Sequence, residues 1–224
     1  LDPLIHIPDR IFEGYGPNIP AIEALRAAGA SLLATVDCGT MSFEPFARAA
    51  AIGLDVVVID HHQAGEALPP VAALVNPNRI DDLSGLGHLC AVGLVFVTAV
   101  GLVRELRRRG WWTAERPAPD LLAMLDLVAL GTVADVVPLT GLNRAFVTKG
   151  LAVLRRRDRP GLTALMDAAR LSGPPKAWHL GFLLGPRINA GGRIGRASLG
   201  VELMLAADPI ECARIAADLD RLND

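Results

Sequence analysis

Three side chains that can bind a metal ion follow one another at Asp60, His61 and His62. They come directly after residues 56–59, a β-branched run that predicts a buried strand of a parallel sheet. In an open α/β sheet, ligands bind in the crevice beyond the carboxyl ends of the strands. The alternative is a polar turn with Asp60 as a helix cap and two solvated histidines. We favour a metal site, because crowding these groups together without a cation is costly.

Two further carboxylates stand in comparable surroundings. Asp37 follows residues 31–36, an apolar stretch that predicts the strand preceding the Asp-His-His group. Because neighbouring parallel strands end at the same edge of a sheet, Asp37 and the Asp-His-His group can share one metal cluster. Asp135 lies between small and apolar residues, where a carboxylate must be paired or must hold a cation. We therefore expect Asp135 to join the same cleft.

A stretch rich in glycine and arginine occupies residues 185–193, Gly-Pro-Arg-Ile-Asn-Ala-Gly-Gly-Arg. Its composition predicts a loop that interrupts the helices around it. Glycines let a backbone approach an anion closely, and guanidinium groups bind phosphate through paired hydrogen bonds. No acidic partner for Arg187 stands nearby in the sequence. We expect Arg187 and Arg193 to bind an anion, and the family resemblance described below implies that this anion is a substrate phosphate.

The elements that must position these groups alternate between strand and helix in the first part of the chain. This order is typical of a doubly wound, mainly parallel α/β sheet. The expected strands are 4–7, 31–36, 56–59 and 72–75, and the expected helices are 19–28, 43–51, 89–109, 120–130, 143–155, 198–206 and 209–222. From residue 160 the pattern is helical and less regular. We therefore expect an α/β domain at residues 1–157 and a helical extension at 158–224.

Composition narrows the class of protein. The formal net charge of −2 gives no general basis for binding nucleic acid or a membrane, so a nucleic-acid partner needs a local patch. The longest apolar run, residues 91–103, is too short to span a bilayer, and we expect no membrane partner.

Cys38, Cys90 and Cys212 are widely spaced and form no Cys-x-x-Cys pair. They argue for a reducing compartment and against a disulfide framework or a zinc finger.

Four stretches occur in an order and spacing that resemble the DHH phosphoesterase superfamily and, within it, the bacterial single-strand-specific 5′–3′ exonucleases. They are residues 35–39, 58–62, 131–139 and 185–190. The Asp-His-His triplet alone is shared with pyrophosphatases and oligonucleotide hydrolases. The Gly-Pro-Arg-Ile-Asn-Ala stretch is more specific to the exonucleases.

The resemblance implies roles for single residues. Asp37 would bridge two divalent ions, Mn²⁺ or Mg²⁺, while His61 and Asp135 would bind one of them. His62 would contact the scissile phosphate or orient the attacking water. Asp60 would hold a histidine in one tautomer. Mixed carboxylate and imidazole ligands favour Mn²⁺ over Mg²⁺.

On this resemblance we expect a cytoplasmic single-stranded-DNA-specific 5′–3′ exonuclease that acts in DNA repair and recombination by a two-metal mechanism. A single-strand-binding protein and a helicase are the further partners that it implies. The superfamily's first motif, Asp-x-Asp, would precede Leu1, and its C-terminal domains would follow Asp224. We therefore expect these 224 residues to be an inactive segment of a longer enzyme with part of the two-metal site missing.

Two other functions stay open at this point. One is a small-molecule or oligonucleotide phosphoesterase or pyrophosphatase of the same superfamily. The other is a non-catalytic replication scaffold that has kept the fold and lost the metals. Intact residues at Asp37, His61 and Asp135 argue against the scaffold.

Overall fold

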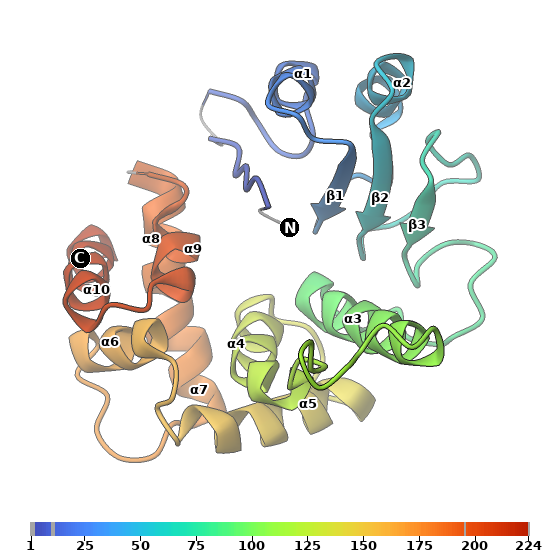
Figure 1. Ribbon diagram of the computed structural model, residues 1–224. Coiled ribbons are helices and arrows are strands. Elements are labelled where there is room, and N and C mark those ends of the chain that lie inside the picture. Colours follow the sequence, from blue (N-terminus) through green and yellow to red (C-terminus); the bar gives the residue numbers. More distant parts are fainter. Residues whose placement is uncertain (1–2, 10–11, 195, 224) are drawn as a thin grey trace. The chain divides into compact units, whose positions relative to one another are not determined.

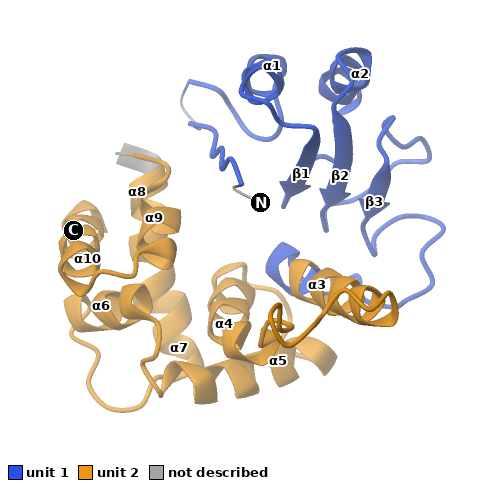
Figure 2. Ribbon diagram, in the orientation of Figure 1, with its two compact units in different colours: residues 1–94 blue, residues 95–224 orange. Residues whose placement is uncertain are grey.

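The structure, a computed structural model, describes residues 3–9, 12–194 and 196–223, without the side chains of residues 193 and 194. It divides into two compact units, Leu1–Leu94 and Val95–Asp224 (Figure 2), and each is described by itself. The first unit holds the sheet and the second is helical. The expected α/β class, with a parallel sheet and a helical C-terminal part, is confirmed. The expected domain boundary at residue 157 stays a prediction.

The first unit is built on a three-stranded parallel sheet in the order β1, β2, β3 (Figure 1). Its strands are β1 (Leu32–Val36), β2 (Asp55–Ile59) and β3 (Ala73–Val75). Val36 pairs with Ile59, and Ile59 pairs with Val75, so the three strands end level with one another. The strands predicted at these three places are confirmed.

Two helices, α1 (Ile19–Ala27) and α2 (Phe43–Ala51), lie side by side in this unit (Figure 1). The core of the unit contains Ile22, Phe46, Ala49, Leu54, Val56 and Val58. Because alternate residues of a strand point to the same side, Val56 and Val58 of β2 bury one face of the sheet in this core. Both helices agree with the sequence prediction.

Residues 4–7 form no strand, and this part of the prediction is wrong. Leu4 and Ile5 are 54% and 57% exposed. A short apolar run becomes a strand only when its backbone groups pair with a neighbour, and β1 pairs with β2 alone in the described sheet. The apolar pattern was therefore not sufficient to define a strand.

The second unit is helical. Its elements are α3 (Ala91–Arg108), the 3₁₀ helix η1 (Leu121–Met124), α4 (Leu125–Ala134), α5 (Gly141–Leu154), α6 (Pro160–Ala168), α7 (Ala177–His179), the π-helix η2 (Leu180–Leu184), α8 (Gly185–Ile194), α9 (Leu199–Leu205) and α10 (Pro209–Asn223). The boundary between the units falls within α3, whose first turn belongs to the first unit. Asp120 caps η1, because its side chain accepts hydrogen bonds from the backbone of Leu122 and Ala123. Among the most deeply buried core residues are Leu162, Leu165, Leu180, Leu184, Leu203 and Leu219.

The glycine- and arginine-rich stretch is the helix α8, not the predicted loop. Glycine lowers helix stability by roughly 1 kcal/mol per residue relative to alanine, so local preference opposes this helix. Packing explains why glycine is nevertheless present. A Cβ added at Gly191 would lie only 2.9 Å from Leu219 Cδ2 of α10. Tertiary packing has therefore overridden the local signal.

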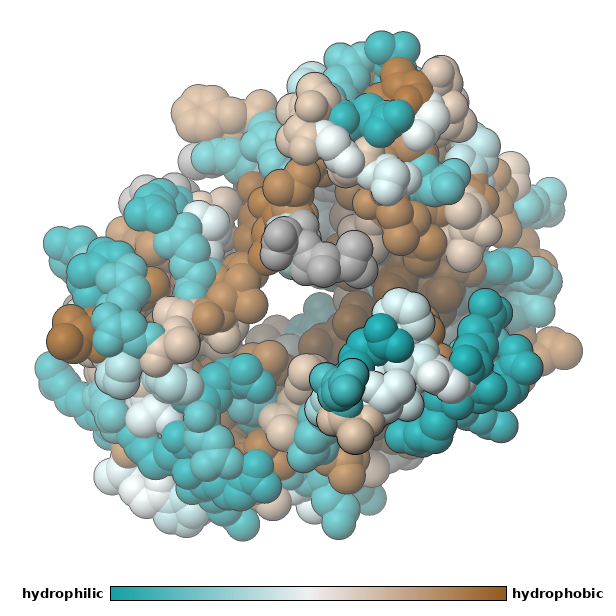
Figure 3. All heavy atoms as spheres, viewed as in Figure 1, coloured by the Kyte–Doolittle hydropathy of each residue, from teal (hydrophilic) through white to brown (hydrophobic). Residues whose placement is uncertain are grey.

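Hydrophilic residues gather over the C-terminal end of α3 on the face drawn in Figure 3. Glu105 pairs there with Arg108 and Arg109 at 2.6 and 2.7 Å. These charges form a solvated helix end, in which the arginines also complement the helix dipole. Of the helices described, none combines the length and the apolar content that a membrane span requires.

Candidate metal centre

The carboxyl edge of the sheet brings three polar residues next to one another. Asp37, Asp60 and Asn76 each follow the last residue of a strand directly. The strand ladder continues through two of them, since Asp37 N–H donates to the Ile59 carbonyl and Asp60 N–H to the Val75 carbonyl, both at 3.0 Å. The level strand ends therefore turn three positions far apart in the sequence into neighbours.

Asp37 leaves β1 in the left-handed region of backbone space, with φ +61°. Aspartate tolerates this conformation better than most residues do. The hydroxyl of Tyr15 donates to the Asp37 backbone carbonyl and lies 3.4 Å from His62 Nε2. The Tyr15 ring also meets the His62 ring edge-on, with 5.9 Å between centroids. Tyr15 thus links the turn after β1 to the histidines after β2.

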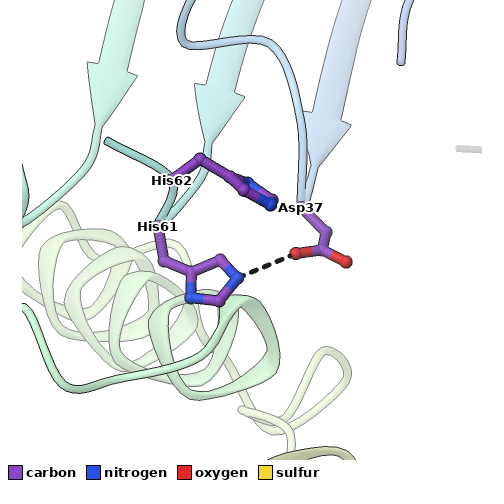
Figure 4. A group of neighbouring side chains, drawn as sticks. All are labelled: Asp37, His61 and His62. Atoms are coloured by element: carbon purple, nitrogen blue, oxygen red, sulfur yellow. Dashed lines mark ion pairs between the residues drawn. The ribbon is translucent and has the colours of Figure 1, made fainter. Parts of the chain in front are cut away.

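Asp37, His61 and His62 direct their polar atoms toward one another (Figure 4). His61 Nε2 lies 3.1 Å from Asp37 Oδ1, and one ligand atom from each of the three residues lies within 4.8 Å of the other two. Their side chains are 54%, 16% and 51% exposed in that order, so the group can be reached from solvent. A carboxylate oxygen with two imidazole nitrogens is a donor set that suits Mn²⁺ and related divalent ions. These residues fit a metal centre.

Asp60 is not in this group of three, because its carboxylate points into the turns. It is 1% exposed, and Oδ1 accepts hydrogen bonds from the His61 and His62 backbone at 2.8 and 3.3 Å. Oδ1 also lies 2.7 Å from His62 Nδ1, and Oδ2 accepts from the backbone and hydroxyl of Thr40. Burial raises the pKa of the Asp60 carboxyl, but the hydrogen bonds from Thr40 and His62 outweigh burial and hold the pKa at about 2. Asp60 is therefore ionised at neutral pH.

Two asparagines after β3 hold the backbone of the histidine pair. Asn76, 3% exposed, donates from Nδ2 to the His62 carbonyl and to Thr40 Oγ1, both at 2.8 Å. Asn78 donates from its side chain to the His61 carbonyl. Both carbonyls of the pair are thus fixed from the neighbouring strand, which limits the freedom of the two imidazoles.

Cys38 follows Asp37 directly in the chain, but its side chain is a protonated thiol at neutral pH. Burial, and after it the negative charges of Asp60 and Asp37, raise the pKa of the Cys38 thiol to about 11. Since the thiolate is the form that binds metals, this protonated thiol is a poor ligand at neutral pH.

Asp135 lies in the second unit, at the C-terminal end of α4. Asp135 itself is exposed. The residue after it, Val136, has φ +59° and is 86% exposed. A β-branched residue in the left-handed region is a genuine outlier, and such strain collects at functional sites. The meeting of Asp135 with the residues of the first unit stays a prediction.

The guanidinium of Arg187 has partners inside the protein. It is 13% exposed, and Nε donates to Asp220 Oδ1 at 2.7 Å while Nη1 donates to the Leu183 carbonyl at 2.8 Å. The acidic partner that the nearby sequence lacks therefore comes from α10, 33 positions away. The side chain of Arg193 lies outside the described residues. Phosphate binding by either arginine stays a prediction.

The structure thus brings together the predicted residues of the first unit and adds four that the sequence did not single out as site residues. These are Tyr15, Thr40, Asn76 and Asn78. Asn76 had a usable signal, since it follows a predicted strand directly, just as Asp37 and Asp60 do.

Comparisons with known proteins show the family to which the chain belongs. The family described as "DHH family, N-terminal domain" matches residues 2–132. Single-stranded-DNA-specific exonuclease RecJ of Dickeya dadantii is 43% identical over 221 residues, which cover 97% of this chain and 38% of that protein. A crystal structure of exonuclease RecJ bound to manganese matches 97% of this chain and 52% of that chain, with a TM-score of 0.82 and 35% identity. The Mn²⁺ complex of RecJ from Thermus thermophilus gives a TM-score of 0.76 and 33% identity over 92% of this chain and 29% of that one.

The chain spans only part of the length of these relatives, 38% in the first case and 52% in the second. The match nevertheless extends over both units, because it covers 97% of the chain. It therefore includes the candidate metal ligands of the sheet and the helical residues that follow them.

Proposed function

Because the chain belongs to the DHH family, we propose that it forms the metal-binding core of a single-stranded-DNA-specific 5′–3′ exonuclease. The observation that carries the proposal is the convergence of Asp37, His61 and His62 at the carboxyl edge of the sheet. The relatives named above support it, since the name of the Dickeya dadantii protein states this substrate and two RecJ structures were solved with manganese. They favour a polymer substrate over the small phosphate esters and pyrophosphate that the Asp-His-His triplet alone leaves open.

The cofactor we propose is a pair of Mn²⁺ or Mg²⁺ ions. Asp37 would bind both ions, and His61 and Asp135 would bind one of them. When bound, such ions neutralise charge on phosphate oxygens and lower the pKa of a bound water, so that the water loses a proton more readily and can attack phosphorus. The histidine-carboxylate contact of 3.1 Å supports the assignment, because both groups are already turned toward one place.

His62 and Asp60 would act together beside the ions. The ionised Asp60 lies 2.7 Å from His62 Nδ1 and would accept a hydrogen bond from Nδ1–H, so that Nε2 of the neutral ring carries no proton. That nitrogen would orient the attacking water or accept a hydrogen bond from it. Protonated, the same ring would instead donate to the scissile phosphate. Arg187 and Arg193 would bind phosphates further along the strand.

We also propose the setting in which such an enzyme works. Single strands arise in DNA repair and recombination, when a helicase opens a duplex and a single-strand-binding protein covers the product. An exonuclease specific for single strands needs a supply of this kind. The cytoplasm of a bacterium is the compartment that fits these partners.

Hydrolysis by the full-length protein tests the proposal. We expect release of nucleotides from the 5′ end of single-stranded DNA in Mn²⁺, with little action on duplex DNA, inorganic pyrophosphate or small phosphate esters. Asp37→Ala should abolish the reaction with unchanged circular dichroism, because nothing replaces a bridging carboxylate. Asp55→Ala, an exposed aspartate at the start of β2, is the control. Normal turnover by folded Asp37→Ala would refute the proposal, and preference for pyrophosphate would replace it with the small-molecule function.

A further inference from the structure

The last turn of α4, which ends at Asp135, packs against two glycines of a neighbouring helical segment. A Cβ added at Gly185 would lie 3.0 Å from the Leu180 carbonyl oxygen of its own segment, and 3.3 Å from Ala134 Cβ and 3.8 Å from Ala134 Cα of α4. A Cβ added at Gly181 would lie 3.2 Å from Val133 Cγ1. The distances of 3.2 and 3.3 Å are shorter than the ordinary separation of carbon atoms in contact, so α4 would have to move slightly to admit either side chain. The absence of two side chains therefore lets η2 and α8 approach the end of α4 closely.

This contact reaches the backbone of the residue next to Asp135. Ala134 has only a methyl group, which cannot turn aside as a long side chain does. Asp135 N–H donates to the Gly131 carbonyl at 2.9 Å, so Asp135 is still part of the same helical turn. A displacement of Ala134 would therefore move the Asp135 backbone with it.

The segment that carries the glycines is itself fixed in place. Gly185 N–H donates to the Leu180 carbonyl across the wide turn of the π-helix η2. Arg187 then ties η2 to α10, through the Leu183 carbonyl at 2.8 Å and Asp220 at 2.7 Å. Single π-helical turns often occur at functional sites. The two glycines that pack against α4 therefore belong to a segment that these hydrogen bonds hold in place.

We propose that Gly185, assisted by Gly181, is a positioning residue that sets the place of Asp135 at the metal centre. The inference rests on the proposed function, in which Asp135 is a metal ligand. It explains why helix-weakening glycines stand at two positions facing α4. It also gives the Gly-Pro-Arg stretch a structural role, in packing against α4, that does not involve the substrate.

Two alanine substitutions and one compensating glycine substitution in the full-length protein test the inference. Gly185→Ala adds a methyl group against Ala134, whereas Gly192→Ala adds one in the same helix with nothing within 4 Å. We expect Gly185→Ala to raise the Mn²⁺ concentration for half-maximal hydrolysis roughly tenfold, as loss of a ligand's supporting contact does. Excess Mn²⁺ should restore the rate, and Gly192→Ala should leave the Mn²⁺ requirement unchanged. Adding Ala134→Gly to Gly185→Ala removes the opposing methyl group of α4 and should recover part of the affinity, while the contact with the Leu180 carbonyl oxygen stays.

The outcomes separate this inference from the proposed function. If Asp135→Asn weakens Mn²⁺ binding but folded Gly185→Ala does not, the positioning role is wrong and the metal site stands. If Asp135→Asn binds Mn²⁺ like the wild type, Asp135 is no ligand and both ideas fail at this residue. Should Gly185→Ala not fold, the milder Gly181→Ala decides, with a rise of a few-fold in the Mn²⁺ requirement expected. An unchanged requirement in Gly181→Ala would overturn the proposal.

Discussion

Asp60 Oδ1 lies 2.7 Å from His62 Nδ1, while Oδ2 of the same carboxylate is held by the backbone and hydroxyl of Thr40. One buried side chain therefore connects the turn after β1 to the histidines after β2. Because Oδ1 also accepts from the backbone of His61 and His62, the carboxylate determines the path of the chain as well as the tautomer of His62.

This relationship predicts a large cost for Asp60→Asn. Both oxygens of Asp60 face backbone N–H groups, so the amide nitrogen of asparagine must oppose a donor in either orientation. We expect a loss of roughly 2–3 kcal/mol in the free energy of unfolding, the cost of an unsatisfied buried donor beside a lost charged hydrogen bond. Urea unfolding measures it, with exposed Asp55→Asn as the control near zero. Equal stability of the two variants would show that the hydrogen bonds around Asp60 are dispensable.

The ion pair between Arg187 and Asp220 predicts that Arg187→Ala destabilises the fold. The change leaves a part-buried carboxylate without its partner and frees the Leu183 carbonyl. We expect a loss of roughly 1–3 kcal/mol. Arg221→Ala, which removes a 78% exposed arginine from α10, should cost less than about 0.5 kcal/mol. Thermal unfolding of the two variants side by side checks the difference, and a loss no larger than that of Arg221→Ala would contradict it.

The same variant decides whether Arg187 also binds phosphate. If it does, the slope of the logarithm of the DNA-binding constant against the logarithm of salt concentration should fall by about one for Arg187→Ala. Asp220→Asn breaks the same ion pair and keeps the guanidinium, so its slope should match the wild type. An unchanged slope in Arg187→Ala would leave the arginine with its internal role alone.

Close packing of α4 on α5 predicts that Gly150→Ala is severely destabilising. An added Cβ would lie 2.1 Å from the Leu125 carbonyl oxygen and 2.5 Å from Ala129 Cβ. The helices must separate to admit it, and we expect a loss above about 3 kcal/mol, at the upper end of overpacking effects. Gly101→Ala in α3 meets nothing within 4 Å and should instead stabilise by roughly 0.5–1 kcal/mol. Equal unfolding temperatures for the two variants would be inconsistent with this packing.

Much of the first unit could be predicted because its physics is local. A β-branched run bounded by polar residues defines a strand, and parallel strands in register bring their ends together, so Asp37 and His61 were paired correctly from sequence. Thr40 could not be found in this way, because its partner Asp60 is 20 positions away and reached only through the folded sheet. Asn76 follows from the strand-end rule once that rule is applied to β3.

The errors arise where tertiary contacts outweigh local preference. Residues 4–7 have a strand-like composition, but the described sheet gives them no partner. The glycines of α8 suggest a loop until Leu219 and Ala134 are seen packed against them.

Mn²⁺ binding by a double-mutant cycle of His61 and Asp135 tests the central claim most directly. Calorimetric titration of the full-length protein would compare the wild type, His61→Ala, Asp135→Ala and the double variant, with circular dichroism to verify folding. Two ligands of one ion are coupled, so the account predicts that each single change weakens binding strongly and the second adds much less. Wild-type affinity in Asp135→Ala, or losses that add in full, would contradict a shared metal centre.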